Sequence, residues 1–146
     1  MTHDSADLDP SEYRKLEEFR FQIRRFLAFS EKAARDSGIE PHQHQALLAL
    51  MATPAQALPT IGHLAERLLL KHHSAVELVD RMQMLDLVTR EANPEDARQV
   101  LVKLTTKGRR ILHRLSLGHR VELEETGPRL AAALRAISRK APVAIP

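Results

Sequence analysis

The residues that decide the fold are LAERLLLKHHSAVELVDRM, at positions 64–82. Their pattern predicts two short helices, 60–68 and 72–86, that cross steeply. Such a pair needs apolar facing sides, a small residue where the backbones approach and a short turn; Ala65 is the small residue here. The facing apolar residues are Leu64, Leu68 and Leu70 in the first part and Ala75, Leu78, Val79 and Met82 in the second. By itself this spacing fits a helix-turn-helix and a plain pair of core helices equally well.

The next residues, LVTREANPEDARQVLVKLTTKG at positions 87–108, predict a β-hairpin. Strands are expected at 87–91 and 99–104, with a turn signalled by Asn-Pro at 93–94. Arg98 lies near the tip of this hairpin. When a helix fills the major groove of DNA, a protruding wing reaches the neighbouring minor groove, whose negative potential attracts arginine. The hairpin therefore favours the helix-turn-helix over the plain helix pair.

Longer helices are expected on both sides of this region. Ser11 is expected to cap a helix that ends near Gly38, whose apolar residues recur in steps of three and four, as in a helix packed along a partner helix. A second helix covers 42–51. After the hairpin, Thr105 or Thr106 caps a long helix that we expect Gly127-Pro128 to interrupt before a last helical segment.

The composition excludes several classes of protein. The chain has 146 residues, a net charge of +3 and no cysteine, so disulfide frameworks and thiolate metal sites are excluded. It has neither a continuous apolar run long enough to cross a membrane nor the pattern of a secretory signal. These features predict a cytoplasmic protein, and the mild positive charge permits nucleic-acid binding without requiring it.

Five short segments together resemble the MarR family of transcriptional regulators. The resemblance covers roughly Ile39 to Leu115, and its most specific part is an Asp-x-Arg in the wing followed by Leu-Thr-x-x-Gly at the start of the next helix. The matching segments are Leu64–Leu68, Leu78–Met82, Leu87–Arg90, Asp96–Arg98 and Leu104–Gly108. Three positions depart from the family pattern: Leu69 and Asp86 stand where a glycine or small residue is usual, and Glu77 where a basic or small polar one is usual.

The resemblance implies a mainly α fold, a winged helix-turn-helix with a small β-hairpin wing and long N- and C-terminal dimerisation helices. The expected organisation is a disordered arm at 1–10, a helical dimerisation lobe at 11–38 and 106–140, a DNA-binding lobe at 39–105 and a flexible tail at 141–146. The residues assigned to the dimer seam are Leu16, Phe19, Ile23, Leu130, Leu134 and Ile137.

The resemblance also implies a function and its partners. The chain is expected to bind a pseudo-palindromic operator in double-stranded DNA as a homodimer and to act as a repressor that a small aromatic or phenolic ligand releases. Two alternatives stay open: a winged-helix module used for protein contacts, and a regulator or activator without a small-molecule effector. No nucleophile with a neighbouring base is evident, so an enzyme is not expected, and no cofactor is predicted.

Candidate DNA contacts gather at the start of the second short helix and on the wing. Ser74 either contacts DNA or caps the helix, and Glu77 either tunes base choice or points sideways. Arg98 is assigned to the minor groove, whereas Asp96 and Arg81 are assigned to support of the wing, Asp96 by orienting Arg98 or by pairing with Arg81. The predicted DNA-binding residues are Lys71, His72, His73, Ser74, Glu77, Arg90 and Arg98.

The remaining histidines and arginines suggest no metal site but outline a ligand pocket. None of the histidine spacings gives a closed ligand set. In the resembled family, effectors bind among the first two helices, the fifth helix and the winged lobe, where an arginine and a histidine beside apolar walls would suit an aromatic carboxylate. The matching residues are Arg20, Ile23, Arg24, His44, Leu47 and Met51. The alternative is that Arg20 and Arg24 are solvated surface charges and that His44 is a satisfied core residue.

Overall fold

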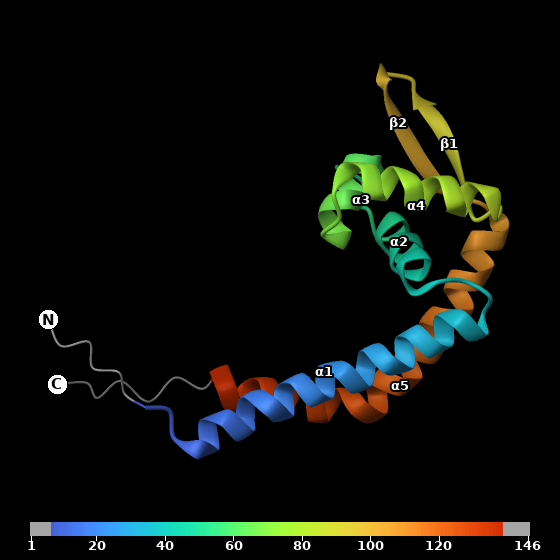
Figure 1. Ribbon diagram of the computed structural model, residues 1–146. Coiled ribbons are helices and arrows are strands. Elements are labelled where there is room, and N and C mark those ends of the chain that lie inside the picture. Colours follow the sequence, from blue (N-terminus) through green and yellow to red (C-terminus); the bar gives the residue numbers. More distant parts are fainter. Residues whose placement is uncertain (1–6, 139–146) are drawn as a thin grey trace, which may run out of the picture. The chain divides into compact units, whose positions relative to one another are not determined.

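The computed structural model describes residues 7–138 (Figure 1). Over this range the chain forms five helices and a single antiparallel hairpin. In order, the elements are α1 (Pro10–Asp36), α2 (Pro41–Met51), α3 (Ile61–Leu68), α4 (His72–Met84), β1 (Val88–Asn93), β2 (Asp96–Leu104) and α5 (Thr106–Ser138). The predicted fold class, a mainly helical winged helix-turn-helix with a small β wing, is confirmed.

Contacts divide the chain into two compact units, and their borders differ from the lobes that the sequence suggested. One unit holds residues 31–118, and the other holds 7–30 together with 119–138 among the described residues. The end of α1 and the first part of α5 therefore belong with the winged lobe. Ala34 and Leu112 account for this, because both side chains are buried in the core of that lobe.

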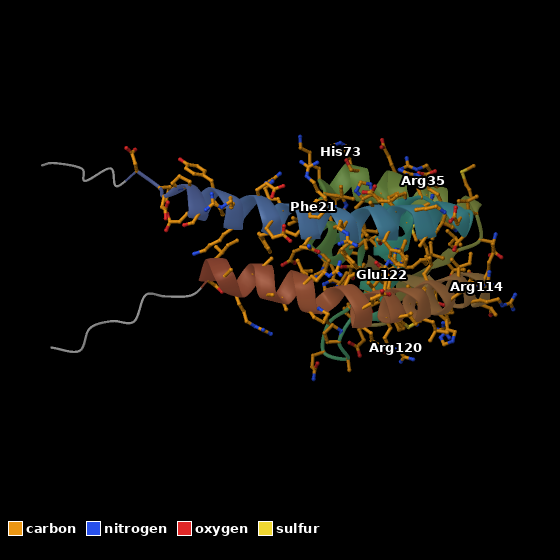
Figure 2. All side chains as sticks on the ribbon, turned by 90° about the horizontal axis from the view of Figure 1, so that it is seen from below. Phe21, Arg35, His73, Arg114, Arg120 and Glu122 are labelled. Atoms are coloured by element: carbon orange, nitrogen blue, oxygen red, sulfur yellow. The ribbon has the colours of Figure 1, made fainter. Side chains whose placement is uncertain are left out.

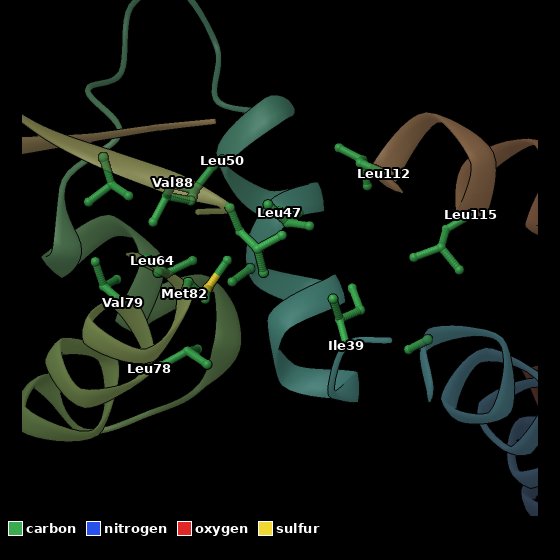
Figure 3. Close-up of a cluster of buried hydrophobic side chains, with 14 residues drawn as sticks. Ile39, Leu47, Leu50, Leu64, Leu78, Val79, Met82, Val88, Leu112 and Leu115 are labelled. Carbon is green, nitrogen blue, oxygen red and sulfur yellow. The ribbon is translucent and has the colours of Figure 1, made fainter. Parts of the chain in front are cut away.

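The core of the 31–118 unit joins all of its elements (Figure 3). Leu47 from α2, Leu64 from α3 and Met82 from α4 are fully buried there, and each such side chain contributes about 1.5–3 kcal/mol by leaving water. β1 and β2 add Val88 and Val102, which are also buried. The inward residues predicted for the two short helices, including Ala65 as the small contact, are confirmed.

The wing is anchored to the lobe by a third extended segment. β1 and β2 pair antiparallel, from Val88 opposite Leu104 outward to a register shift at Ala92/Asn93. At the base, the Val102 amide donates to the Pro59 carbonyl at 2.8 Å, and Thr60 forms a bridge with Leu101. The short extended piece before α3 thus fixes β2 to the helices.

Three helices end with the same left-handed turn, although only one of them has glycine there. Gly38, Leu69 and Asp86 have φ of 82°, 55° and 58°. In each turn the next amide reaches back five residues, as in Leu70 N to Ala65 O at 2.9 Å and Leu87 N to Met82 O at 2.9 Å. The positions where the sequence departs from the family's small residues therefore keep the backbone conformation that glycine favours.

The left-handed conformation at Leu69 lowers the stability of the protein, and Leu69→Gly is expected to raise the free energy of unfolding. A β-carbon in this conformation is strained, and the side chain gains no compensating burial because it is 93% exposed. We expect a gain of about 0.5–1 kcal/mol after allowing for the greater freedom of glycine in the unfolded chain. Urea denaturation measures it. Leu69→Ala keeps the β-carbon and is the control; an equal gain there would refute the strain argument.

Two expected helix boundaries differ from the structure. α1 begins at Pro10, not after Ser11: the Asp9 carboxylate accepts hydrogen bonds from the Ser11 hydroxyl at 2.7 Å and its amide at 3.5 Å. The predicted interruption at Gly127-Pro128 is wrong, because α5 continues through Pro128. Proline lacks the amide hydrogen that would bond to the carbonyl of Glu124. Glu124 is exposed, so water can satisfy that carbonyl.

The expected arm falls mainly on residues 1–6, and the expected tail falls wholly outside the described residues.

In the other unit α1 and α5 run side by side (Figure 1). The His119 ring lies edge-on to Phe26 and Phe29, with centroids 5.9 and 5.2 Å away, and is 2.8 Å from the Ser30 hydroxyl. Much apolar surface stays uncovered, since Leu16 and Leu134 of the predicted seam are 44% and 49% exposed. Phe19, Ile23, Leu130 and Ile137 are partly buried.

Within residues 7–138, none of the helices has the length and apolar character needed to cross a membrane.

Candidate nucleic-acid interface

The first turn of α4 presents a row of polar and basic side chains. Lys71, His72 and His73 are exposed, and Ser74 is partly exposed (His73 is labelled in Figure 2). Lys71 is the N-cap residue and no side chain caps the helix, so the alternative that Ser74 is the cap does not hold. The free amides of this turn favour anions such as phosphate.

Packing fixes the orientation of α4. Ala75, Leu78, Val79 and Met82 are all buried, and α3 packs closely against the helix. Because these four residues form one stripe, the opposite face must point to solvent. The helix is therefore held rigidly with its N-terminal end and outer face available.

At the wing, Asp96 holds Arg98. One carboxylate oxygen of Asp96 accepts from the Arg98 amide at 3.0 Å and from its Nε at 3.2 Å. The Arg98 side chain is nevertheless 92% exposed. Of the two predicted roles for Asp96, the structure has the one in which it orients Arg98, and this leaves the terminal guanidinium nitrogens of Arg98 directed to solvent.

A second arginine joins the wing to α4. Arg90 on β1 forms an ion pair with Asp80 on α4 at 2.5 Å and also donates to Gln83 on the same helix. Its side chain is only 26% exposed. These contacts favour a bracing role for Arg90, and its predicted contact with a DNA phosphate stays untested.

Arg81, in contrast, does not support the wing in the way the sequence suggested. Its side chain is exposed, and no hydrogen bond or ion pair to another residue of the 7–138 range is found for it. Sequence reasoning missed Asp80 and Gln83 as the helix partners of the wing. The available signal was Asp80 itself, since an acid on a helix expected to approach phosphates calls for a nearby cation.

The junction between α4, the hairpin and α5 explains the Leu-Thr-x-x-Gly pattern. Thr105 caps α5 by accepting from the Gly108 amide at 3.0 Å, and its hydroxyl donates to the Asp86 carbonyl at 2.6 Å. Its amide donates to Leu87 O at 3.0 Å. A Cβ at Gly108 would lie 2.2 Å from that same oxygen, so glycine is required where α5 crosses the start of β1.

The predicted ligand-pocket residues fall in both units. Arg20, Ile23 and Arg24 belong to the 7–30 segment, whereas His44, Leu47 and Met51 belong to α2. His44 is buried and Leu47 completely so, whereas Met51 is 50% exposed. The pocket therefore stays a prediction.

Sequence reasoning did not single out an open groove of about 650 Å³ between α2 and α3. Leu48, Ala49, Ala52, Pro54 and Leu68 supply apolar walls, and Gln45, His63 and Arg67 supply polar groups. No group of three potential metal ligands occurs among residues 7–138.

The helix pair, the braced hairpin and the exposed α4 face together define a winged helix-turn-helix protein. A family model described as the MarR family matches residues 37–99. The chain is 31% identical over 105 residues to the uncharacterized HTH-type transcriptional regulator YkoM of Bacillus subtilis. The aligned region covers 70% of this chain and 66% of YkoM, so the chain spans just under two thirds of that protein. These matches support a MarR-family winged-helix transcriptional regulator.

Solved structures share the fold. The fold is similar to that of AbsC, a MarR family transcriptional regulator from Streptomyces coelicolor, with a TM-score of 0.73 and 18% identity over 88% of this chain and 90% of that one. It is also similar to the M. tuberculosis transcriptional regulator MOSR in complex with DNA, with a TM-score of 0.58 and 25% identity over 81% and 88% of the two chains. These relatives are regulators and not enzymes, in agreement with the prediction from sequence.

Proposed function

We propose that this chain is a homodimeric, sequence-specific DNA-binding regulator that represses transcription in the cytoplasm until a small aromatic or phenolic ligand releases it. The observation that carries the proposal is the Asp80–Arg90 ion pair, which ties the wing to the solvent-facing helix α4. A helix in the major groove and a loop in the adjacent minor groove bind together at lower entropic cost when the distance between them is fixed. The similar MOSR structure is a complex with DNA, which supports DNA binding by this chain.

Dimerisation is supported by the uncovered apolar side chains of the 7–30 and 119–138 unit. Tyr13, Leu16, Phe21, Val121 and Leu134 are each more than two fifths exposed in the single chain. Exposed apolar surface on this scale marks an interaction site. A second copy covering it would give the two-fold symmetry that a pseudo-palindromic operator requires, with recognition helices about 34 Å apart.

Release by a ligand follows from population shift. A ligand lowers operator affinity if it binds more tightly to a lobe spacing that cannot match successive major grooves. In the groove between α2 and α3, His63 and Arg67 lie beside apolar walls, a combination that suits an aromatic carboxylate. Titrating benzoate and simple phenols into the protein–operator complex, and measuring release of DNA, tests this part of the proposal.

Binding of genomic fragments by the purified full-length protein tests the function itself. We expect enrichment of a fragment with a pseudo-palindromic footprint whose half-sites lie about one helical turn, 10–10.5 base pairs, apart. Affinity should fall steeply as salt rises, because phosphate contacts release counterions. Weak binding without a footprint would favour the winged-helix module for protein contacts and would contradict the proposal.

A further inference from the structure

The outward face of α4 carries an acidic side chain, Glu77, that no other residue of the described 7–138 range neutralises. At 100° per residue, His73 and Glu77 lie one turn apart on the side of α4 opposite the buried stripe. Both are exposed. Within residues 7–138, the Glu77 side chain makes no hydrogen bond or ion pair. An acid is unexpected on a surface that must approach phosphates, because it lowers affinity for DNA in general.

The other acid of this helix face is accounted for. Asp80 pairs with Arg90 at 2.5 Å, and this contact braces the wing. Glu77 has no such structural task, and it lies in the N-terminal half of α4, the half of a recognition helix that contacts base edges. Its carboxylate is therefore available to a base.

The chemistry of a carboxylate restricts which base it can accept from. An ionised carboxylate is an acceptor only. In the major groove guanine presents only acceptors, N7 and O6, and thymine presents O4, so both repel it. Adenine offers its N6 amino group but places the N7 acceptor beside it. Cytosine offers its N4 amino group and has no acceptor of its own on the major-groove edge, and Glu or Asp accepting from it is a known pairing.

We infer that Glu77 determines base specificity, accepting a hydrogen bond from the N4 amino group of one cytosine in each half-site. This inference rests on the proposed function, since it assigns a base to the DNA surface of α4. The charge of Glu77 lowers affinity for any DNA, and the cytosine contact restores affinity only at the correct site. Discrimination of one C·G pair in this way corresponds to about tenfold in affinity.

Selection from a library of random double-stranded DNA, with the full-length protein, tests the inference. Wild type should enrich cytosine at one symmetric position of each half-site. Glu77→Gln should change that preference to adenine, because an amide both donates and accepts and so pairs with N7 and N6 of adenine. Glu77→Ala should lose the preference at that position and bind random DNA more tightly. All other positions of the selected site should stay the same.

Glu66→Gln is the matched control, because it removes the same charge from an exposed position on α3. It should leave the base preference unchanged. If Glu77→Gln and Glu77→Ala select the same sequence as wild type, or if wild type enriches another base there, the inference is wrong while the proposed function stands. If wild type selects no sequence at all, the proposed function itself fails.

Discussion

Gly108→Ala is expected to destabilise the winged lobe by about 3 kcal/mol, at the upper end of what overpacking usually costs. The new Cβ would lie 2.2 Å from the Leu87 carbonyl oxygen and 3.3 Å from Cδ2 of Leu47. The first of these contacts is with backbone, so a change of rotamer cannot relieve it. The start of α5 would have to move away from Leu87, and the hydrogen bonds of Thr105 to Leu87 O and Asp86 O would weaken. Urea denaturation measures the loss.

Gly118→Ala is the matched control in the same helix. A Cβ at Gly118 meets no atom within 4 Å, and alanine favours a helix interior by about 0.8–1.0 kcal/mol over glycine. This control should therefore be neutral or stabilising, so that the two substitutions change stability in opposite directions. A Gly108→Ala protein as stable as wild type would show that the approach of α5 to Leu87 is not tight in solution.

Sequence patterns predicted the elements of the fold because most of them depend on local signals. The stripe in α4 and the strand alternation around Val102 are periodic, and Thr105 caps α5 as the sequence suggests. Gly127-Pro128 misled the prediction because the cost of proline depends on whether the orphaned carbonyl is buried, which a sequence does not reveal. Leu69 shows the converse, since it adopts a left-handed turn that a leucine disfavours.

The candidate site was predictable where a residue acts alone and less so where residues act in pairs. Exposure of His73 and of Arg98 follows from their places on a helix face and at a hairpin tip. The ion pair between Asp80 and Arg90 joins residues on different elements. It depends on how the hairpin packs against α4, which the sequence does not show. Arg81 was assigned to the support of the wing because the packing of the hairpin against α4 was not known from the sequence. The same bridge explains why only one of the two acids on α4 is left for DNA.

Arg98→Ala is expected to weaken operator binding by about 1–3 kcal/mol, the usual value of a single specific arginine contact. The side chain is 92% exposed, and exposed ion pairs contribute little to stability, so folding should be unaffected. The effect depends on the position of the side chain: Asp96 accepts from both the amide and Nε of Arg98, which holds the guanidinium beside Asp96 with its terminal nitrogens exposed. A positively charged group preordered in this way enters a narrow minor groove at low entropic cost.

Affinity for the selected operator at two salt concentrations measures the effect, and Arg35→Ala is the control. Arg35 is an exposed arginine in the last turn of α1 (Figure 2). Arg35→Ala removes the same charge at a position outside the surface formed by α4 and the wing, so it should change affinity for the operator little. Asp96→Ala separates placement from charge. Removing an acid should strengthen DNA binding if only net charge mattered, whereas weaker binding is expected here because Arg98 loses its support. Unchanged affinity of Arg98→Ala at both salt concentrations would remove the wing from the DNA interface.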